Sequence, residues 1–436
     1  MRILVPLRRG GPMDKDVIGL SDIALHIPEP YIKLDTLVAE RVKEDPHLEK
    51  HLDRAIKVTG QKGLHFNKIY EDTVTMAAQA CLNLTQNGRL NQGHVRFLTI
   101  GTETGVDMSK AASSYVLGMM EKAGLPFPKN LSTFQVQHAC AGGTLSMITV
   151  AGFLKAASLN GDTAVVLTSD IARYPTPSTA EVTQGAGATA LMIKRNPDLL
   201  AFDLESVGFY SKDTDDFFRP LGSPVAMVKG GYSVQCYHES LIGAFEDHCE
   251  RLGVSPAEEL KSIDIFALHV PYSLLPVGAM EKLLSKYLGM DKETADAYLK
   301  EKGFFQSVYP TSEVGNIYTG SLFLGLAWSL KDRYEQFGEQ IVGKKVMMAS
   351  YGSGNTMAVL TGWVSPRAPE VISTWNLDRY LSGGYQASFE EYLEWTKTYQ
   401  PQGNIEERLE RDAPKPGHFY LTNLREDGYR EYGFRQ

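Results

Sequence analysis

Cysteine is scarce in this chain, and its spacing excludes two kinds of stabilising site. The 436 residues contain four cysteines, Cys81, Cys140, Cys236 and Cys249. They form no Cys-x-x-Cys pair and have no metal-ligand spacing with histidine, so the sequence predicts neither a disulfide framework nor a zinc site. We therefore expect reduced cysteines and no bound metal ion, with Cys81 in the hydrophobic core.

Long apolar runs and clusters of positive charge are also missing. The longest apolar segments, such as 321–328, fall well short of the roughly 20 residues of a membrane-spanning helix, and the N-terminus has no signal-peptide pattern. The formal net charge is −8, and no basic block is longer than Arg8-Arg9, so the electrostatic footprint of a nucleic-acid-binding protein is absent. We expect a cytoplasmic protein with neither a membrane nor a nucleic acid as partner.

What is present is a repeated order of strands and helices. Hydrophobic residues make up 43% of the chain, enough for a large core. In the first half the pattern predicts strands near 17–25, 95–101, 164–168 and 188–193, and helices near 72–87, 109–123 and 140–158. The second half reads as strands near 199–210, 263–269 and 344–350, with helices near 233–252, 277–287 and 320–334. This periodicity predicts an α/β fold with two similar βαβαβ halves.

The same pattern sets the expected domain boundaries. We predict an irregular leader over residues 1–16, one half over 17–197 and the other over 198–365. A charged helical stretch is expected from about 34 to 59. Residues 366–436 are rich in charged and aromatic side chains with little strand pattern, and we expect a C-terminal extension that packs on the core or on a partner subunit.

The segment 134–150 delivers one cysteine to the start of an apolar helix. Because the N-terminus of a helix carries partial positive charge and unpaired N–H groups, Cys140 in the first turn would be favoured as a thiolate. Such a residue could be a nucleophile. From this segment alone, a buried structural cysteine is an equally good interpretation.

Polar residues at the ends of other strands favour the nucleophile hypothesis. Ligands in α/β proteins bind beyond the carboxyl ends of strands, so Glu103, Cys140, His269, Asn316 and residues 350–354 should converge between the halves. Taken alone, Glu103 would more often be a solvated strand end or a cap, and His269 a core histidine. Because both residues are expected at the same edge as Cys140, a functional role becomes the favoured interpretation for each.

Eight separated motifs resemble those of the 3-hydroxy-3-methylglutaryl-CoA (HMG-CoA) synthases of the thiolase superfamily, over roughly residues 17–365. They are Gly101-Thr-Glu103-Thr-Gly-Val-Asp107, His138-Ala-Cys140-Ala-Gly-Gly-Thr144, Ser169-Asp170-Ile-Ala-Arg-Tyr174, Asp216-Phe-Phe-Arg219-Pro, Ser233-Val-Gln-Cys-Tyr237, His269-Val-Pro-Tyr272, Gly315-Asn316-Ile-Tyr-Thr and Tyr351-Gly-Ser-Gly354. The resemblance implies a thiolase-like fold, layered α-β-α-β-α, and a homodimer.

It also implies a Claisen-type condensation between two acyl thioesters. Cys140 would carry an acetyl group from acetyl-CoA, because thioester exchange keeps the carbonyl activated. Glu103 would take a proton from the acetyl methyl group, with its pKa raised by desolvation. The carbanion would add to a 3-oxoacyl thioester such as acetoacetyl-CoA, and protonated His269 would stabilise the alkoxide. The product would then be hydrolysed from the enzyme, with no metal or redox cofactor.

Further positions match the family's pocket. Asn316 and the backbone near Cys140 and Ser353 would hold acyl carbonyls. Supporting positions near the pocket are Tyr174, Thr183, Asp107, Asp170, Asp216 and Phe217. Asp170 and Asp216 could equally hold loops through hydrogen bonds to the backbone. Cys236 and His238 are expected to be packing residues, and His138 to be buried beside the nucleophile.

Three departures from the family pattern concern the substrate. Leu274 stands where the family has a lysine for the CoA phosphates, Ala141 where an aromatic residue is common, and Lys229 where an acidic residue is common. These changes leave open a synthase that takes its thioester from an acyl carrier protein and adds a β-branch to a polyketide. A third-type ketoacyl synthase is disfavoured by Glu103. A catalytically idle acyl-thioester scaffold is disfavoured by the intact Cys140, Glu103 and His269.

Overall fold

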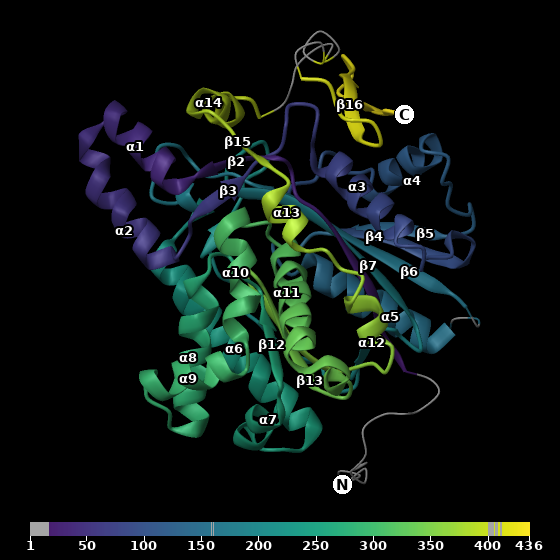
Figure 1. Ribbon diagram of the computed structural model, residues 1–436, viewed down its shortest axis with the longest axis vertical. Coiled ribbons are helices and arrows are strands. Elements are labelled where there is room, and N and C mark those ends of the chain that lie inside the picture. The colour runs from purple at the N-terminus through teal and green to yellow at the C-terminus, as the bar shows by residue number, and fades with distance from the viewer. Residues whose placement is uncertain (1–16, 158, 160, 400–404, 406–408, 410–411) are drawn as a thin grey trace.

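The computed structural model describes residues 17–157, 159, 161–399, 405, 409 and 412–436, and a large mixed β-sheet runs through its centre (Figure 1). The predicted leader lies outside these residues. Ten strands form the sheet in the order β12 (Ile265–Leu268), β13 (Lys345–Gly352), β14 (Thr356–Val364), β8 (Leu200–Phe202), β1 (Ile18–His26), β7 (Gly185–Arg195), β6 (Thr163–Ala172), β4 (Val95–Gly101) and β5 (Ser132–Val136), with β9 (Gly208–Ser211) paired to β14.

Strand pairing repeats between the two halves, as predicted. In the first half β4 and β6 are parallel, β6 and β7 antiparallel, and β7 and β1 antiparallel. In the second half β12 and β13, β13 and β14, and β14 and β8 pair in the same three ways. The halves join where β1 meets β8. The single strand predicted over 199–210 is wrong: a turn in which the Glu205 backbone N–H donates to Asp203 separates β8 from β9.

Helices lie in three layers around these strands. Between the halves lie α5 (Gly142–Ala157) and α11 (Gly320–Phe337), in one core with residues of β1, β6, β7, β12, β13 and β14. On one outer side lie α3 (Thr73–Gln86) and α4 (Ala112–Lys122), and on the other α6 (Gly230–Leu252) and α8 (Leu274–Leu288). The second half also contains α7 (Pro256–Ser262), α9 (Lys292–Glu301) and α10 (Phe304–Val314). This arrangement confirms the predicted α-β-α-β-α layering.

One segment of the described chain, 139–157, which contains α5, is long and apolar enough to cross a membrane. Its mean hydropathy is 1.3, and 56% of the tested window is buried inside the fold. Its residues Met147, Val150, Ala151 and Leu154 pack in the central core. The apolar composition of this helix therefore follows from its place between the two halves.

The predicted helical stretch 34–59 is broken in the structure. It forms α1 (Leu34–Glu44), a 3-10 turn (Pro46–Leu48) and α2 (Glu49–Thr59). Proline at position 46 cannot donate a backbone hydrogen bond, and the side chain of Asp45 caps the turn by accepting from the His47 N–H at 2.9 Å. Both helices pack against β2 (Pro30–Lys33), β3 (Gly63–His65) and α14 (Phe389–Lys397) in a separate small core.

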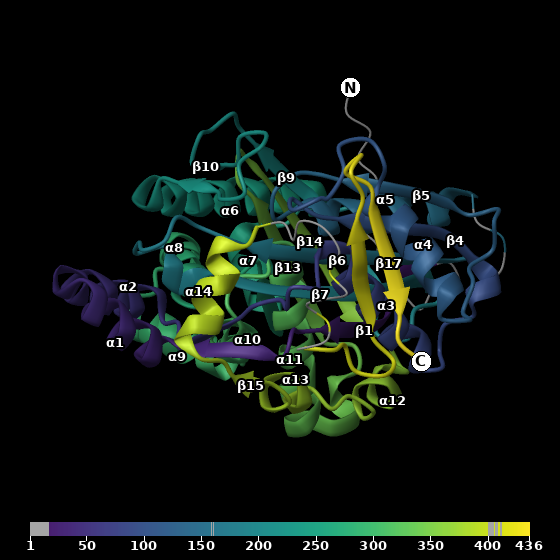
Figure 2. The same cartoon turned by 90° about the horizontal axis from the view of Figure 1, so that it is seen from above.

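The C-terminal extension packs first on the second half of the fold, where α12 (Ala368–Ile372) contacts α11 and α13 (Asp378–Ser382) contacts α10, and then on the first half. After these helices, β15 (Tyr385–Gln386) pairs with β2 and leads into α14. The chain ends in a hairpin of β16 (Phe419–Leu424) and β17 (Arg430–Phe434), which lies over α3 (Figure 2). The expectation of little strand structure is wrong here, because Phe419, Leu421 and Tyr432 point alternately into the core with α3 and α4.

Candidate active site

Cys140 lies in a tight loop between β5 and α5. Ala139 has a left-handed backbone with φ of 40°, and the Ala141 N–H donates to the His138 carbonyl at 3.0 Å. Helix α5 begins at Gly142, so the predicted position of Cys140 within the first helical turn is wrong by two residues. Gly352 lies against this loop so closely that a Cβ there would be 2.5 Å from the His138 oxygen. The loop is thereby fixed to the second half of the fold.

Glu103, just beyond the end of β4, contacts the cysteine directly. The Cys140 thiol donates a hydrogen bond to Glu103 Oε1 at 3.2 Å. Burial, and then the nearby Asp170, raise the pKa of Glu103 to about 8. Burial and the Glu103 carboxylate raise the pKa of the Cys140 thiol as well, which is opposite to the direction expected from a helix N-terminus. Both groups therefore favour their protonated forms at neutral pH in this poorly solvated pocket.

Asp170, on β6, holds the turn that carries Glu103. Its Oδ1 atom accepts four hydrogen bonds: from the hydroxyls of Thr102 and Thr104 at 2.8 and 2.7 Å, and from the N–H groups of Glu103 and Thr104 at 3.0 and 3.1 Å. Burial raises the pKa of Asp170 to about 6. The loop-holding role considered for Asp170 fits these contacts, and its negative charge adds to the raised pKa of Glu103.

His269 follows β12 and is buried, with 1% of its surface exposed. Its backbone N–H donates to Ala349 on β13 at 2.8 Å, and Tyr237 donates to its carbonyl at 2.7 Å. Neither ring nitrogen has a hydrogen-bond partner within the described part of the chain. Burial lowers the pKa of His269 to about 3 and so disfavours the predicted protonated imidazole. A neutral ring still offers one N–H donor.

Aromatic residues form the walls around Cys140. Phe217 in β10 (Phe217–Phe218) lies edge-on to Tyr174, with ring centroids 6.5 Å apart, and to Tyr318 at 5.9 Å. These three residues share one buried cluster with Cys140. The Asn316 side chain accepts from the Tyr318 N–H at 2.8 Å, which fixes a residue whose φ is 47°. An acyl group on Cys140 would lie in a dry, aromatic pocket.

Two of the predicted pocket residues have structural contacts of their own. Thr183 donates its hydroxyl to the Ala180 carbonyl at 2.8 Å, and its carbonyl accepts from the Asn316 N–H at 3.2 Å. Asp107 accepts from the N–H groups of Ser109 and Lys110, both at 2.7 Å, and these bonds lower its pKa. Thr183 therefore links two loops, and Asp107 shapes a turn at the cavity wall.

Ser353 lies in a turn after β13 that is fastened by buried Asp216. The Asp216 carboxylate accepts four hydrogen bonds: from Gly354 N–H at 3.0 Å, Tyr351 hydroxyl at 2.8 Å, Thr214 hydroxyl at 2.9 Å and Ser233 hydroxyl at 3.2 Å. Asp216 is thus a loop-holding residue. It keeps the Ser353 backbone beside the cysteine loop.

Replacing Asp216 with asparagine should loosen this turn. The NH₂ group of asparagine is itself a donor, and it would face some of the four groups that now donate to the Asp216 carboxylate. We therefore expect the free energy of unfolding to fall by about 2–4 kcal/mol. The turnover number should fall with it. Urea unfolding and steady-state kinetics measure both. Unchanged stability and turnover would mean that the turn does not depend on the carboxylate.

One continuous cavity of about 1580 Å³ reaches this site. Glu103, Phe217, Arg219, Ser353 and Gly354 line one part of it. Its other walls come from residues 66–73, from the loop 217–224 and from α14 and the residues that follow it. No group of three or more His, Cys, Asp or Glu side chains in the described ranges could hold a metal ion.

Of the three departures from the family pattern, Ala141 adjoins the cysteine, whereas Leu274 and Lys229 lie at the surface and do not line the cavity. Leu274 is 43% exposed at the first residue of α8 and lies beside Gly60. Ala141 is buried, with its Cβ facing Gly352. Lys229 pairs with Asp215 at the surface. Whether these changes alter the substrate stays a prediction.

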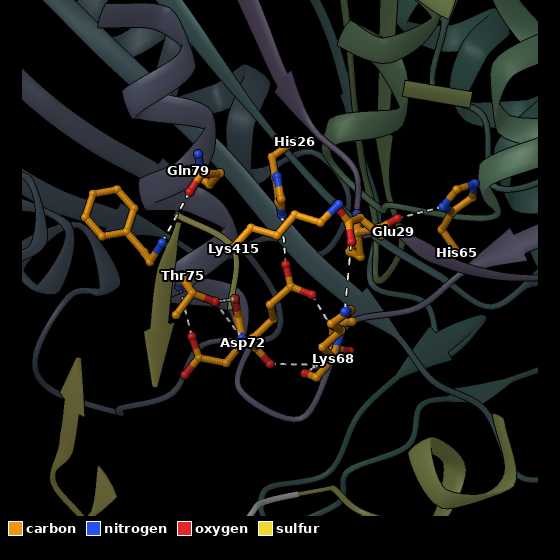
Figure 3. Close-up of polar contacts among 12 residues, drawn as sticks. His26, Glu29, His65, Lys68, Asp72, Thr75, Gln79 and Lys415 are labelled. Atoms are coloured by element: carbon orange, nitrogen blue, oxygen red, sulfur yellow. Dashed lines mark hydrogen bonds and ion pairs between the residues drawn. The ribbon is translucent and has the colours of Figure 1, made fainter. Parts of the chain in front are cut away.

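Ion pairs connect residues 66–73 and Glu29 to the C-terminal extension; Figure 3 shows Lys68, Glu29 and Lys415 among these residues. Lys68 pairs with Asp412 at 2.9 Å, and Lys415 pairs with Glu29 at 2.5 Å. The Lys68 N–H also donates to the Glu71 carboxylate at 2.9 Å. The extension is therefore part of the wall of the cavity.

Sequence reasoning missed two sets of residues around the site. Arg219 donates to the Glu103 carbonyl at 3.3 Å and to the Tyr318 hydroxyl at 3.2 Å; both Arg219 and Tyr318 lay within quoted motifs. Tyr392 of α14, in contrast, lies outside all of the quoted motifs. It donates to Glu181 at 2.8 Å and accepts from the Gln184 amide at 2.8 Å, and Gln184 in turn accepts from the Tyr174 N–H at 2.9 Å.

Replacing Tyr392 with phenylalanine should test this link between α14 and the pocket. Glu181 and Gln184 would each lose a buried partner, so we expect a loss of about 1–3 kcal/mol in the free energy of unfolding. Urea denaturation measures it. Tyr385→Phe is the matched control, because Tyr385 is exposed and donates to Glu391 at 2.6 Å. Equal, small losses in both variants would contradict the role given to Tyr392.

The duplicated α/β fold and the cysteine paired with a buried glutamate define a condensing enzyme of the thiolase-like class. Comparison with protein-family models identifies the family within this class. Residues 16–198 match the family model described as hydroxymethylglutaryl-coenzyme A synthase N terminal, and residues 279–435 match the C-terminal one. The chain belongs to the hydroxymethylglutaryl-CoA synthase family.

Individual relatives agree with this assignment. A hydroxymethylglutaryl-CoA synthase of Enterococcus faecalis is 31% identical over 347 residues, which are 79% of this chain and 82% of that protein. The structure of MvaS in complex with 3-hydroxy-3-methylglutaryl coenzyme A has a TM-score of 0.83 and 30% identity, covering 97% of this chain and 100% of that one. The curacin-pathway HMG synthase in complex with holo donor-ACP shares the fold, with a TM-score of 0.82 at 22% identity over 96% and 100% of the chains.

Proposed function

We propose that the protein is a hydroxymethylglutaryl-CoA synthase-type acyltransferase in which Cys140 is the nucleophile. In the first step the Cys140 sulfur attacks the carbonyl of an acetyl thioester, and the thiol of the donor leaves. The Glu103 carboxylate accepts the proton of Cys140 through their hydrogen bond and passes it to the departing sulfur of the donor, which leaves as the thiol. This contact in an aromatic pocket is the observation that carries the proposal.

Condensation then depends on Glu103 and His269. After Glu103 has released the first proton, its carboxylate removes one from the acetyl methyl group, and the carbanion adds to the ketone of a 3-oxoacyl thioester. The N–H of neutral His269 stabilises the new alkoxide, which takes up the proton that Glu103 removed from the methyl group, so that the Glu103 carboxylate is restored. The unpartnered ring nitrogens of His269 leave it free for such a contact. Asn316 and the backbone around Ser353 hold the acyl carbonyls, and water finally releases the free acid from Cys140.

We assign acetyl-CoA and acetoacetyl-CoA as the first substrates to test. The relative of known structure at 30% identity was solved with 3-hydroxy-3-methylglutaryl coenzyme A, which favours CoA thioesters. Leu274 keeps the carrier-protein alternative open, because it supplies no charge for a CoA phosphate. The proposed chemistry uses thioester and carbonyl activation throughout, so it requires no metal or redox cofactor.

A homodimer and a cytoplasmic location remain part of the proposal. Strand β5 lies at one end of the strand order of the large sheet, opposite β12, and such an edge can pair with the same strand of a second copy. Phe134 on this strand packs edge-on against Phe97, and exposed Phe153 lies beside them. The cytoplasmic location rests on the sequence alone.

Product analysis tests the proposed function. The enzyme should convert acetyl-CoA and acetoacetyl-CoA into 3-hydroxy-3-methylglutaryl-CoA and free CoA, detected by liquid chromatography and mass spectrometry. A parallel reaction should present both acyl groups on phosphopantetheinylated carrier protein. Turnover only with the carrier would establish the alternative, and no product from either would refute the proposal.

Activity should rise with pH through a value near 8. Burial raises the pKa of Glu103 to about 8, so its carboxylate is protonated and inactive as a base below that value. His269 has a pKa lowered to about 3 and stays neutral over the same range. The pH profile of kcat/KM for the condensation should therefore show one ascending limb near pH 8. A limb that falls with rising pH from 6 to 8 would instead indicate an essential protonated imidazole.

A further inference from the structure

We propose that Arg173 forms a subsite for an oxyanion, a carboxylate or phosphate carried by the thioester substrate, at the end of the cavity beneath α14. This subsite deepens the proposed function and rests on it. Arg173 follows directly after β6 and lines the cavity that also contains Glu103. Its neighbours Ala172 and Tyr174 belong to the cluster around Cys140. Arg173 therefore lies at the same strand end as the catalytic pocket.

Arg173 is a buried charge, with 7% of its surface exposed. Burial lowers its pKa to about 10, so the guanidinium keeps its proton at neutral pH. A buried cation is costly unless an opposite charge or hydrogen bonds compensate it. The surroundings of Arg173 should therefore contain a counter-ion.

No carboxylate of the described residues forms an ion pair with Arg173. Its Nη1 group donates one hydrogen bond to the backbone carbonyl of Trp395. The guanidinium carbon lies 4.2 Å from the Trp395 ring centroid and 5.3 Å from that of Tyr399. These rings stabilise the charge in part and hold the guanidinium plane. A guanidinium has five N–H donors, so four of them are left for other partners.

The carboxylates of the same cavity already have other partners. The pairs are Asp72 with Arg430 at 2.9 Å, Asp412 with Lys68 at 2.9 Å, Glu71 with His26 at 3.1 Å, and Glu391 with the Tyr385 hydroxyl at 2.6 Å. Glu394 also lines the cavity but is exposed, and it forms no ion pair with Arg173. The missing counter-ion is thus expected to arrive with a ligand.

Guanidinium chemistry and the course of the cavity identify the kind of ligand. The planar fork of arginine matches carboxylate and phosphate oxygens in a bidentate way. A thioester whose acyl group lies at Glu103 and Ser353 extends within the same cavity. Its anionic group is either a carboxylate at the far end of the acceptor acyl chain or the phosphate at the end of the pantetheine arm.

Three acceptor thioesters separate these two sources. They are acetoacetyl-pantetheine, acetoacetyl-4′-phosphopantetheine and 3-oxoglutaryl-pantetheine, compared in wild type, Arg173→Met and Arg173→Lys. The wild type should have a KM about ten-fold or more lower for one charged acceptor than for the neutral one. We define the KM ratio as the KM for the neutral acceptor divided by that for the preferred charged acceptor. In Arg173→Met this ratio should fall to about one, while the KM for the neutral acceptor stays within about two-fold of the wild-type value. Arg173→Lys, which keeps the charge without the fork, should retain part of the ratio.

A matched control separates ligand binding from the attachment of α14. Ser388 caps α14 by accepting from the Glu391 N–H at 3.2 Å, so Ser388→Ala weakens the helix without touching Arg173. This variant should keep the wild-type ratio. Equal KM values in the wild type, an unchanged ratio in both Arg173 variants, or the same loss in Ser388→Ala would each overturn the subsite. Failure to condense any acceptor would instead refute the proposed function.

Discussion

Replacing Glu103 with glutamine is expected to abolish condensation while acetylation of the enzyme persists. Without this carboxylate, the described residues offer Cys140 no other hydrogen-bonded base that could remove the acetyl methyl proton, and we expect the condensation rate to fall by about 10³-fold or more. Acetylation should persist at a lower rate. The glutamine cannot relay the Cys140 proton, but loss of the Glu103 charge, which raises the pKa of the Cys140 thiol, favours the thiolate. Intact-protein mass and product formation, measured on one sample, check both expectations.

Loss of condensation together with retained acetylation in Glu103→Gln would identify Glu103 as a catalytic base rather than a structural residue. Asp170→Asn is the useful comparison, because Asp170 holds the Glu103 turn without contacting the thiol. That variant should slow condensation and retain measurable turnover. A Glu103→Gln enzyme with full condensation would remove Glu103 from the mechanism. Loss of acetylation in Glu103→Gln would show that the carboxylate is needed to activate the thiol.

Replacing Cys140 with serine should abolish both acetylation and condensation. A serine hydroxyl at this position would form an oxygen ester, which is less activated than a thioester, and its pKa lies far above that of a thiol. We expect the overall rate to fall by about 10⁴-fold or more. The remaining cysteines Cys81, Cys236 and Cys249 are buried in packed cores and should not take over.

Control variants at those positions make the result specific. Cys249→Ala removes a buried thiol from the core of the second half, so it should cost some stability and leave acetylation unchanged. Comparable acetylation of Cys140→Ser and wild type would mean that the acyl group is carried elsewhere. Peptide mapping would then locate it.

Much of the fold followed from local patterns in the sequence. The β-branched strands and small-residue helices repeat in both halves, and the strand pairings of β4, β6 and β7 reappear in β12, β13 and β14. The placement of Glu103 near Cys140 followed from the rule that strand ends in α/β folds share one edge. The hairpin β16–β17 was not foreseen, because its alternation is partly masked by aromatic residues on both faces.

The electrostatics of the site could not be predicted from the sequence. The helix start at Cys140 suggested a thiolate, whereas its pKa depends on burial and on a carboxylate 3.2 Å from the sulfur. His269 was expected to be protonated, but its burial without a hydrogen-bond partner among the described residues, which lowers its pKa, could not be predicted from the sequence. Tyr392 reaches Gln184 across 208 positions of the chain, a contact that local patterns do not encode.

The most direct measurement is the mass of the intact protein after brief incubation with acetyl-CoA, and separately with an acetylated carrier protein. We predict a gain of one acetyl group, mapped to the peptide that contains Cys140 and absent in Cys140→Ser. Acetylation from CoA would support the CoA-dependent synthase, and acetylation from the carrier alone would support the carrier-dependent one. No adduct from either donor, or an adduct on another residue, would contradict the proposal that Cys140 is the nucleophile.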